Sequence, residues 1–159
     1  MAGDEYLQFV TIAKKGATPP NTHEYVVVDA PQVYERNEVM VIYQVELWFG
    51  SNGPKTVAII KLNGREDPAM DTSGKLQHYD EDPTAIVIDE VQIFQDPTGF
   101  YCLREYYFPN GLLYPYKKIF LHIQNQSSST VNVGWVVARI WFRRVRVSAE
   151  ELAELLAST

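Results

Sequence analysis

Three histidines, His23, His78 and His122, are the side chains best suited to chemistry, and they lie far apart in the sequence. None has a second histidine at i+2 or i+4, so the spacing typical of zinc ligands on one strand or helix is missing. The sequence also contains no glycine-rich phosphate loop and no serine-centred nucleophile elbow. We therefore expect no catalytic residue, no metal site and no cofactor.

Two acidic clusters, residues 80–82 and the pair Asp89 and Glu90, are the next candidates. Paired carboxylates can bind a hard cation or flank a sugar. The first cluster lies in a polar stretch interrupted by proline and glycine, residues 63–83, which we expect to be a solvated loop. Asp89 and Glu90 are adjacent in a strand pattern, so they point to opposite faces and cannot act jointly. Cation or receptor binding by the loop stays open as the alternative.

Arginines form the most specific pattern, because four of the seven lie in residues 131–147, VNVGWVVARIWFRRVRV. This run is rich in β-branched and aromatic residues and lacks proline, which predicts a central strand. Strand alternation places Arg139 and Arg143 on one face, and Arg144 and Arg146 on the other. They are candidates to contact phosphates or the carboxylates of a neighbouring subunit. The alternative is that they pair with acids of this chain.

Seven further stretches have strand patterns separated by turn residues, which predicts eight strands in an antiparallel sandwich or barrel. Residues 38–49 alternate most cleanly, and Asn52 and Gly53 follow them. Asn-Gly between two strand patterns predicts a hairpin that pairs 38–49 with 55–62. The expected strands cover residues 6–13, 24–29, 38–49, 55–62, 85–94, 100–107, 116–124 and 131–147.

We predict that the core takes one face of residues 38–49 together with two tryptophans of the last strand. These core candidates are Val41, Tyr43, Val45, Leu47, Trp135 and Trp141. A cluster of tyrosines between residues 101 and 116 is typical of core and subunit interface, and less so of a sugar-binding platform. Of these, the interface candidates are Tyr106, Tyr107 and Tyr114.

Residues 148–157 predict a short C-terminal helix, because Ser148 and Glu151 have the spacing of a capping box. Leu152, Leu155 and Leu156 follow at helical spacing. A helix this short is marginal in water, so its apolar stripe must be buried. We expect the three leucines to meet a neighbouring subunit beside the arginines.

The composition favours one domain, residues 1–159, with 46% apolar and 13% aromatic residues. The net charge is -6, which is atypical of nucleic-acid binders. One cysteine, Cys102, excludes an intrachain disulfide. The first residues lack the apolar region of a signal peptide, so we expect no secretion by that route. No apolar run approaches the length of a membrane span.

The chain from about residue 38 to 157 resembles the small single jelly-roll coat proteins of icosahedral viruses, most closely those of archaeal and environmental viruses. The likeness is carried by LYPYKKIFLHIQNQ at 113–126 and by TVNVGWVVARIWFRRVRVSAEELAEL at 130–155. Within the second motif, the matching residues are Arg139, Ile140, Trp141, Arg143, Ser148, Glu150 and Glu151.

The resemblance implies an eight-stranded antiparallel jelly-roll sandwich with a short C-terminal helix. It implies a structural capsid protein that assembles with itself into an icosahedral virion in the host cytoplasm, and it leaves open whether other coat proteins take part. No basic N-terminal arm is present, so we expect nucleic-acid contact to be weak or indirect. The alternative is a carbohydrate-binding or receptor-ligand sandwich, such as an attachment module or a trimeric ligand. A cupin-like enzyme is disfavoured by the histidine pattern.

Overall fold

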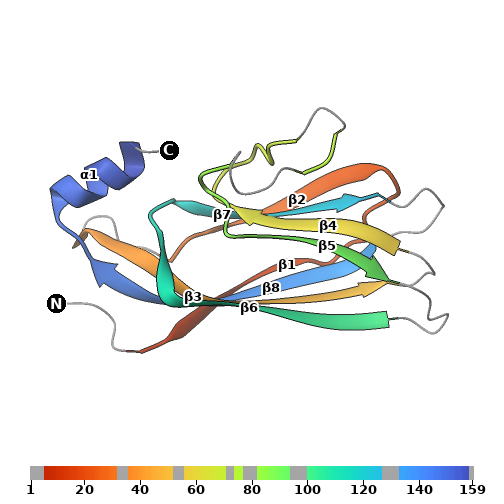
Figure 1. Cartoon of the computed structure of the whole chain (residues 1–159), viewed down its shortest axis with the longest axis horizontal. Coiled ribbons are helices and arrows are strands. Elements are labelled where there is room, and N and C mark those ends of the chain that lie inside the picture. Colours follow the sequence, from red (N-terminus) through yellow and green to blue (C-terminus); the bar gives the residue numbers. More distant parts are fainter. Residues whose placement is uncertain are drawn as a thin grey trace.

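Two four-stranded antiparallel sheets pack face to face in the computed structural model, as Figure 1 shows. It describes residues 6–31, 36–51, 56–70, 74–76, 82–93, 100–126 and 133–157. The first sheet has the order β1 (Gln8–Lys14), β8 (Val133–Arg146), β3 (Glu38–Ser51) and β6 (Phe100–Tyr114). The second has the order β2 (Thr22–Asp29), β7 (Lys118–Asn125), β4 (Thr56–Asn63) and β5 (Val87–Ile93).

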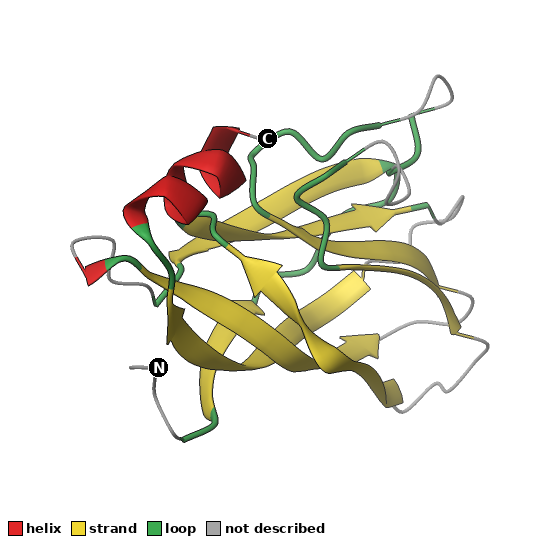
Figure 2. Ribbon diagram, turned by 60° about the vertical axis from the view of Figure 1, so that its left-hand side comes forward, coloured by secondary structure: helices red, strands yellow, loops and turns green. Residues whose placement is uncertain are grey.

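The strand order is that of a jelly roll, because the chain changes sheet at almost every connection. Among the strands of the described residues, β4 and β5 are the one consecutive pair whose members bond to each other. The eight-stranded antiparallel sandwich predicted from the sequence is therefore confirmed, as is the helix α1 (Ala149–Ala157) at its C-terminal end. Figure 2 shows this helix beside one end of the two layers.

The predicted hairpin between residues 38–49 and 55–62 is wrong. β3 is bonded on one side to β8 and on the other to β6, so it has no free edge for β4. The chain instead crosses to the second sheet, where β4 pairs with β5 and β7. The turn residues Asn52 and Gly53 lie outside the described residues.

The core lies between the sheets, and a β-bulge at Tyr43 decides which side chains of β3 enter it. The register to both neighbouring strands shifts between Ile42 and Gln44. A bulge adds one residue and so reverses the alternation. Met40 and Ile42 are fully buried before it, and Val45 and Leu47 after it.

The prediction of one continuous core face on β3 is therefore wrong for Val41 and Tyr43. Both lie on the outer side of the first sheet and are only half-buried. Strand alternation places them in register with Val45 and Leu47 only if the strand is uninterrupted.

Helix α1 begins with the predicted capping box. The Ser148 backbone N–H donates to the Glu151 carboxylate (3.1 Å), and the Glu151 backbone N–H donates to the Ser148 hydroxyl (3.1 Å). Leu152 is buried within this chain, whereas Leu156 is 37% exposed. No helix in the described part of the chain is long and apolar enough to cross a membrane.

The described part of residues 63–83 is only partly solvated: Glu66, Asp67 and Met70 are exposed, but other residues pack on the sandwich. It lies along the outer side of the second sheet (Figure 1), where Leu76 and Asp82 are buried. The strand β6 is also longer than the predicted 100–107, because it continues to Tyr114. Gly111 has a φ of 76°, a conformation that glycine adopts without strain.

Candidate functional site

The outer side of the first sheet carries large apolar side chains that no other part of the described chain covers. We call this surface the aromatic face and define it by Phe9, Trp48, Leu103, Tyr107, Trp135 and Trp141. The register places Phe9 beside Trp141, Trp141 beside Gln44, and Gln44 beside Tyr107, in one row across all four strands. Phe9 is 51% exposed and Tyr107 is 62% exposed.

A second apolar row lies further along the same face. Leu103 is opposite Trp48, and Trp48 is opposite Val137. Leu103 is 40% exposed, and Trp135, two residues beyond Val137 on the same side of β8, is 38% exposed. A monomeric protein rarely exposes a contiguous apolar surface of this kind unless it binds a partner.

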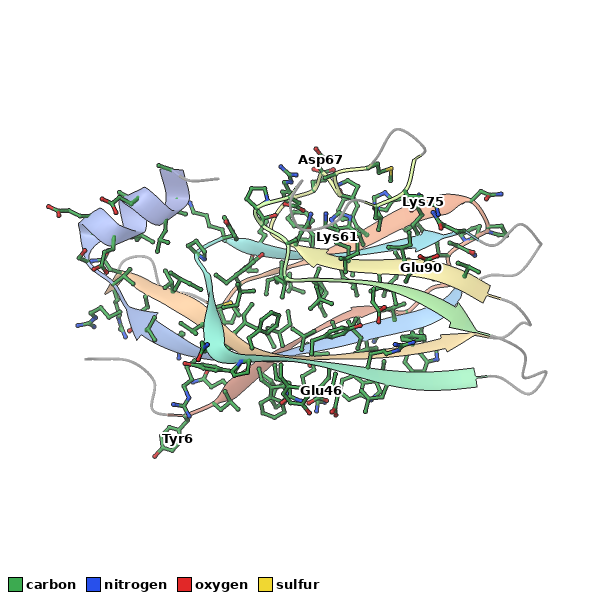
Figure 3. All side chains as sticks on the ribbon, in the orientation of Figure 1. Tyr6, Glu46, Lys61, Asp67, Lys75 and Glu90 are labelled. Carbon is green, nitrogen blue, oxygen red and sulfur yellow. The ribbon has the colours of Figure 1, made fainter. Side chains whose placement is uncertain are left out.

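Charged side chains separate the two rows and hold the rings in place. The guanidinium of Arg139 lies 4.6 Å from the Phe9 ring centroid and 5.2 Å from that of Trp48. The indole N–H of Trp141 donates to Glu46 (2.6 Å), so its one polar group is satisfied. In Figure 3, Glu46 points away from the core on this outer side. The face is thus ordered before any partner binds, which lowers the entropic cost of association.

The prediction that Trp135 belongs to the core is wrong, and so is that for Trp141, which is half-buried on the same outer side. In β8 the even-numbered residues face the core, including Val136, Ile140 and Phe142. Both faces of the strand are apolar, so the sequence pattern does not distinguish them. Trp135 instead lies over Gly50, where a Cβ would be 2.7 Å from the indole nitrogen.

The three tyrosine candidates for an interface separate in the structure. Tyr107 lies on the aromatic face, where its hydroxyl donates to Glu105 (2.6 Å). Tyr106 faces the other way, packs against the core and donates to Asp89. Tyr114 is 1% exposed and donates to the Lys118 carbonyl (2.7 Å), so it belongs to the core. The interface hypothesis is wrong for Tyr114 because the chain turns inward there.

The arginines and leucines near the C-terminus also occupy distinct places. Arg139 is on the aromatic face, Arg143 is exposed and lies 5.7 Å from the Tyr43 ring centroid, and Arg146 is exposed. Arg144 is half-buried on the opposite side of β8. Leu155 is half-buried and Leu156 is exposed, but Leu152 is covered by this chain and is not available to a neighbour.

The outer side of the second sheet is different, because the chain covers part of it with a polar network, although Tyr25 and Val27 of β2 stay exposed there. Lys61, Asn63 and His122 point outward from β4 and β7 and are all 0% exposed. Figure 3 shows Lys61 beneath the segment that carries Asp67. The Lys61 ammonium lies 2.9 Å from the Asp82 carboxylate and donates to the Pro68 carbonyl (2.9 Å).

Asp82 joins this segment to the sheet. It accepts hydrogen bonds from the Asn63 amide (2.9 Å) and from the Thr84 hydroxyl (2.7 Å) and backbone N–H (3.0 Å). Burial alone would raise the pKa of Asp82, but these bonds and Lys61 outweigh it and lower the pKa to about 2. The expectation that this acid is solvated is wrong; residues 80 and 81 lie outside the described residues.

Two histidines that are distant in the sequence meet in this network. His23 Nε2 lies 2.9 Å from His122 Nδ1, and His122 Nε2 lies 2.9 Å from the Asn63 amide oxygen. That oxygen only accepts, so Nε2 of His122 carries the proton and Nδ1 accepts from His23. Burial lowers the pKa of His122 to about 4, although the Arg65 carbonyl opposes this. The sequence gives only a weak indication that the two histidines lie close together. Both occupy outward-facing positions, on the paired strands β2 and β7.

The described residues contain no group of three or more His, Cys, Asp or Glu side chains arranged to hold a metal ion. A polar cleft of about 480 Å³ lies at the end of the second sheet. Its described lining consists mainly of carboxamide side chains: Asn21, Gln124, Asn125 and Gln126, with Gly74 and Lys75.

No family model matches the sequence, and no curated protein matches it. Similar solved structures include dimeric latent PorU from Porphyromonas gingivalis, at 9% identity and a TM-score of 0.44, over 86% of this chain and 13% of that one. The structure of infectious bursal disease virus Gx strain matches at 11% identity and a TM-score of 0.41, over 91% of this chain and 33% of that one. The unassembled KI polyomavirus VP1 pentamer matches at 9% identity and a TM-score of 0.36, over 93% of this chain and 99% of that one.

The chain therefore spans only 13% and 33% of the length of the first two of these structures. The jelly-roll assignment rests on the strand order and register of this chain itself.

Proposed function

We propose that this chain is a structural coat protein that assembles with copies of itself into an icosahedral viral shell. The observation that carries the proposal is the aromatic face: a jelly roll whose first sheet leaves Phe9, Leu103, Tyr107 and Trp135 exposed. Burying such a surface against a partner removes apolar area from water, at roughly 25 cal/mol per Å² before the costs of association. A shell protein needs surfaces of this kind and requires no catalytic centre.

The composition of the face suits a protein partner. Aromatic residues and arginine are the types most enriched at the centres of protein interfaces. Arg139, Glu46 and Glu105 lie in one row, so the face offers both charges to a second copy of itself. We place the protein in the virion, with other coat proteins as possible partners. The net charge of -6 favours weak or indirect contact with the genome.

Electron microscopy and light scattering of the purified chain, over a range of concentrations, test this proposal. The expected result is closed particles or regular capsomers whose fraction rises with concentration. A monomer or small trimer at all concentrations would instead favour the binding-module alternative.

That alternative, a carbohydrate-binding or receptor-ligand sandwich, is favoured by one observation, the carboxamide-lined cleft. Carboxamides both donate and accept hydrogen bonds and therefore match neighbouring sugar hydroxyls. Titration with a panel of neutral and acidic oligosaccharides, followed by chemical shifts of the Asn and Gln side-chain amides, tests it. Saturable shifts at Asn21 and Gln124 support the alternative, and unchanged spectra at millimolar sugar reject it.

A further inference from the structure

A groove beside the C-terminal helix combines an apolar floor with an acidic rim. It has a volume of about 370 Å³ and is lined by Leu113, Val147 and Leu155 with Glu151 and Glu154. Figure 1 shows α1 at the end of the sandwich near the bend from β6 to β7. Leu113 of β6 therefore lines the groove together with residues of the helix. Leu113 is 39% exposed, so the floor is open to solvent.

The helix supplies negative charge without a compensating cation. Glu150, Glu151 and Glu154 are all exposed, and α1 has no basic residue in its last turn. One carboxylate oxygen of Glu151 accepts from Ser148 in the capping box. The groove therefore has the chemistry to hold a long cationic side chain whose stem is apolar.

The same end of the chain also presents such side chains. Arg143 and Arg146 lie at the C-terminal end of strand β8 and are exposed. Within the described ranges neither forms an ion pair. Glu38 lies opposite Arg146 in the β3–β8 register, so it is the intrachain alternative as a partner.

We propose that the groove receives Arg146 of a second copy of this chain, so that each copy both offers an arginine and accepts one. The aliphatic stem packs on Leu113, Val147 and Leu155, and the guanidinium pairs with Glu154 and the rim of Glu151. This inference rests on the proposed self-assembly and names the surface through which one contact forms. A second copy is the favoured occupant because the acidic groove and the exposed arginines belong to one chain and complement each other.

Charge reversal with complementation tests the pairing. Glu154→Arg and Arg146→Glu are each expected to weaken concentration-dependent association by about tenfold or more, because like charges then face each other. Mixing the two variants is expected to restore association to nearly the wild-type level, since each variant then meets an opposite charge on the other. Sedimentation velocity measures all three samples.

The controls separate association from folding. An arginine at position 154 lies toward the C-terminal end of α1, where positive charge favours the helix dipole, so circular dichroism should show an intact helix. Lys15→Glu and Glu90→Arg change the charge equally at exposed sites away from the groove and should associate like wild type, alone and mixed.

Each outcome decides a different claim. Restored association on mixing supports the groove contact. Variants that associate like wild type, or a mixture that stays as weak as its components, overturn it and favour Arg146 paired with Glu38, while the shell proposal stands. A wild-type chain that remains monomeric at every concentration overturns the proposed function and the groove contact together.

Discussion

The two outer faces of the sandwich differ in what covers them. The second sheet is covered by the chain itself, through residues 63–70, Leu76 and Asp82, and its outward side chains form a buried polar network. No described part of the chain covers the first sheet in this way, and its outer side carries aromatic rings in contact with Arg139 and Glu46. A polar network is costly unless every member is satisfied, whereas an apolar face gains from any matching surface. This difference is the basis of the proposal that one face stabilises the monomer and the other binds a partner.

Removing the Asp82 carboxylate should have the largest effect on stability. Asp82→Ala leaves Lys61 buried without its counter-charge, which costs about 3–5 kcal/mol. The free energy of unfolding in urea measures it. Asp29→Ala removes the exposed pair with Lys118 and should cost about 1 kcal/mol or less.

The double variant Asp82→Ala/Lys61→Met sharpens this result. It removes both charges and so should recover part of the stability lost by Asp82→Ala alone. Equal losses for the Asp82 and Asp29 variants would show that the network does not hold the covering segment.

Acidification should weaken the covered face next. The pKa of His122 is about 4 in the fold and 6.5 in the unfolded chain, so the unfolded chain binds more protons between these values. Its contribution is fully present above pH 6.5 and is lost as the pH falls to about 4, on the order of 2–3 kcal/mol. Burial also lowers the pKa of His23, which makes the free energy of unfolding depend more steeply on pH in the same direction.

Urea unfolding at pH 7.5, 5.5 and 4.5 checks this prediction. The Asp82 carboxylate near the pair has a pKa of about 2 and stays ionised over this range. His122→Gln should flatten the dependence on pH even if it lowers stability at pH 7.5. A slope unchanged by that substitution would place the titrating group elsewhere.

Substitutions at two aromatic residues of β8, one on each side of the first sheet, compare how much each side contributes to stability. Phe142 is 1% exposed, so Phe142→Ala should cost about 3–5 kcal/mol. Trp135 is 38% exposed on the aromatic face, so Trp135→Ala should cost about 1–2 kcal/mol. Denaturant midpoints of the two variants test the assignment of faces. Equal losses of stability would show that Trp135 is buried in the core.

The sequence predicted the elements better than their partners. Periodicity located all eight strands, and the spacing of Ser148 and Glu151 predicted the cap of α1, because both signals are local. Strand pairing was not predictable in the same way. The Asn-Gly dipeptide favours a local hairpin, but β3 pairs on one edge with β6 and on the other with β8, so it cannot pair with β4. The bulge at Tyr43 has no sequence signature and reverses every later side chain of β3.

The site was predicted only in part for a related reason. β8 is apolar on both faces, so Trp135 and Trp141 were assigned to the core when they form the exposed surface. Arg139 and Tyr107 were identified as interface candidates and do lie on the aromatic face. The buried network was missed because its members come from β2, β4, β7 and the segment before β5, and only the fold brings them together.

Light scattering over a concentration series, on two double variants with matched charge changes, tests the central claim most directly. Phe9→Lys/Tyr107→Lys places charge on the aromatic face, and Val27→Lys/Met70→Lys places it on exposed apolar residues of the covered side. All of these side chains are at least 40% exposed, so both variants should unfold near the wild-type denaturant midpoint. We predict that the first variant stays monomeric while the second assembles like wild type. Unchanged assembly of the first, or equal loss in both, would contradict the account.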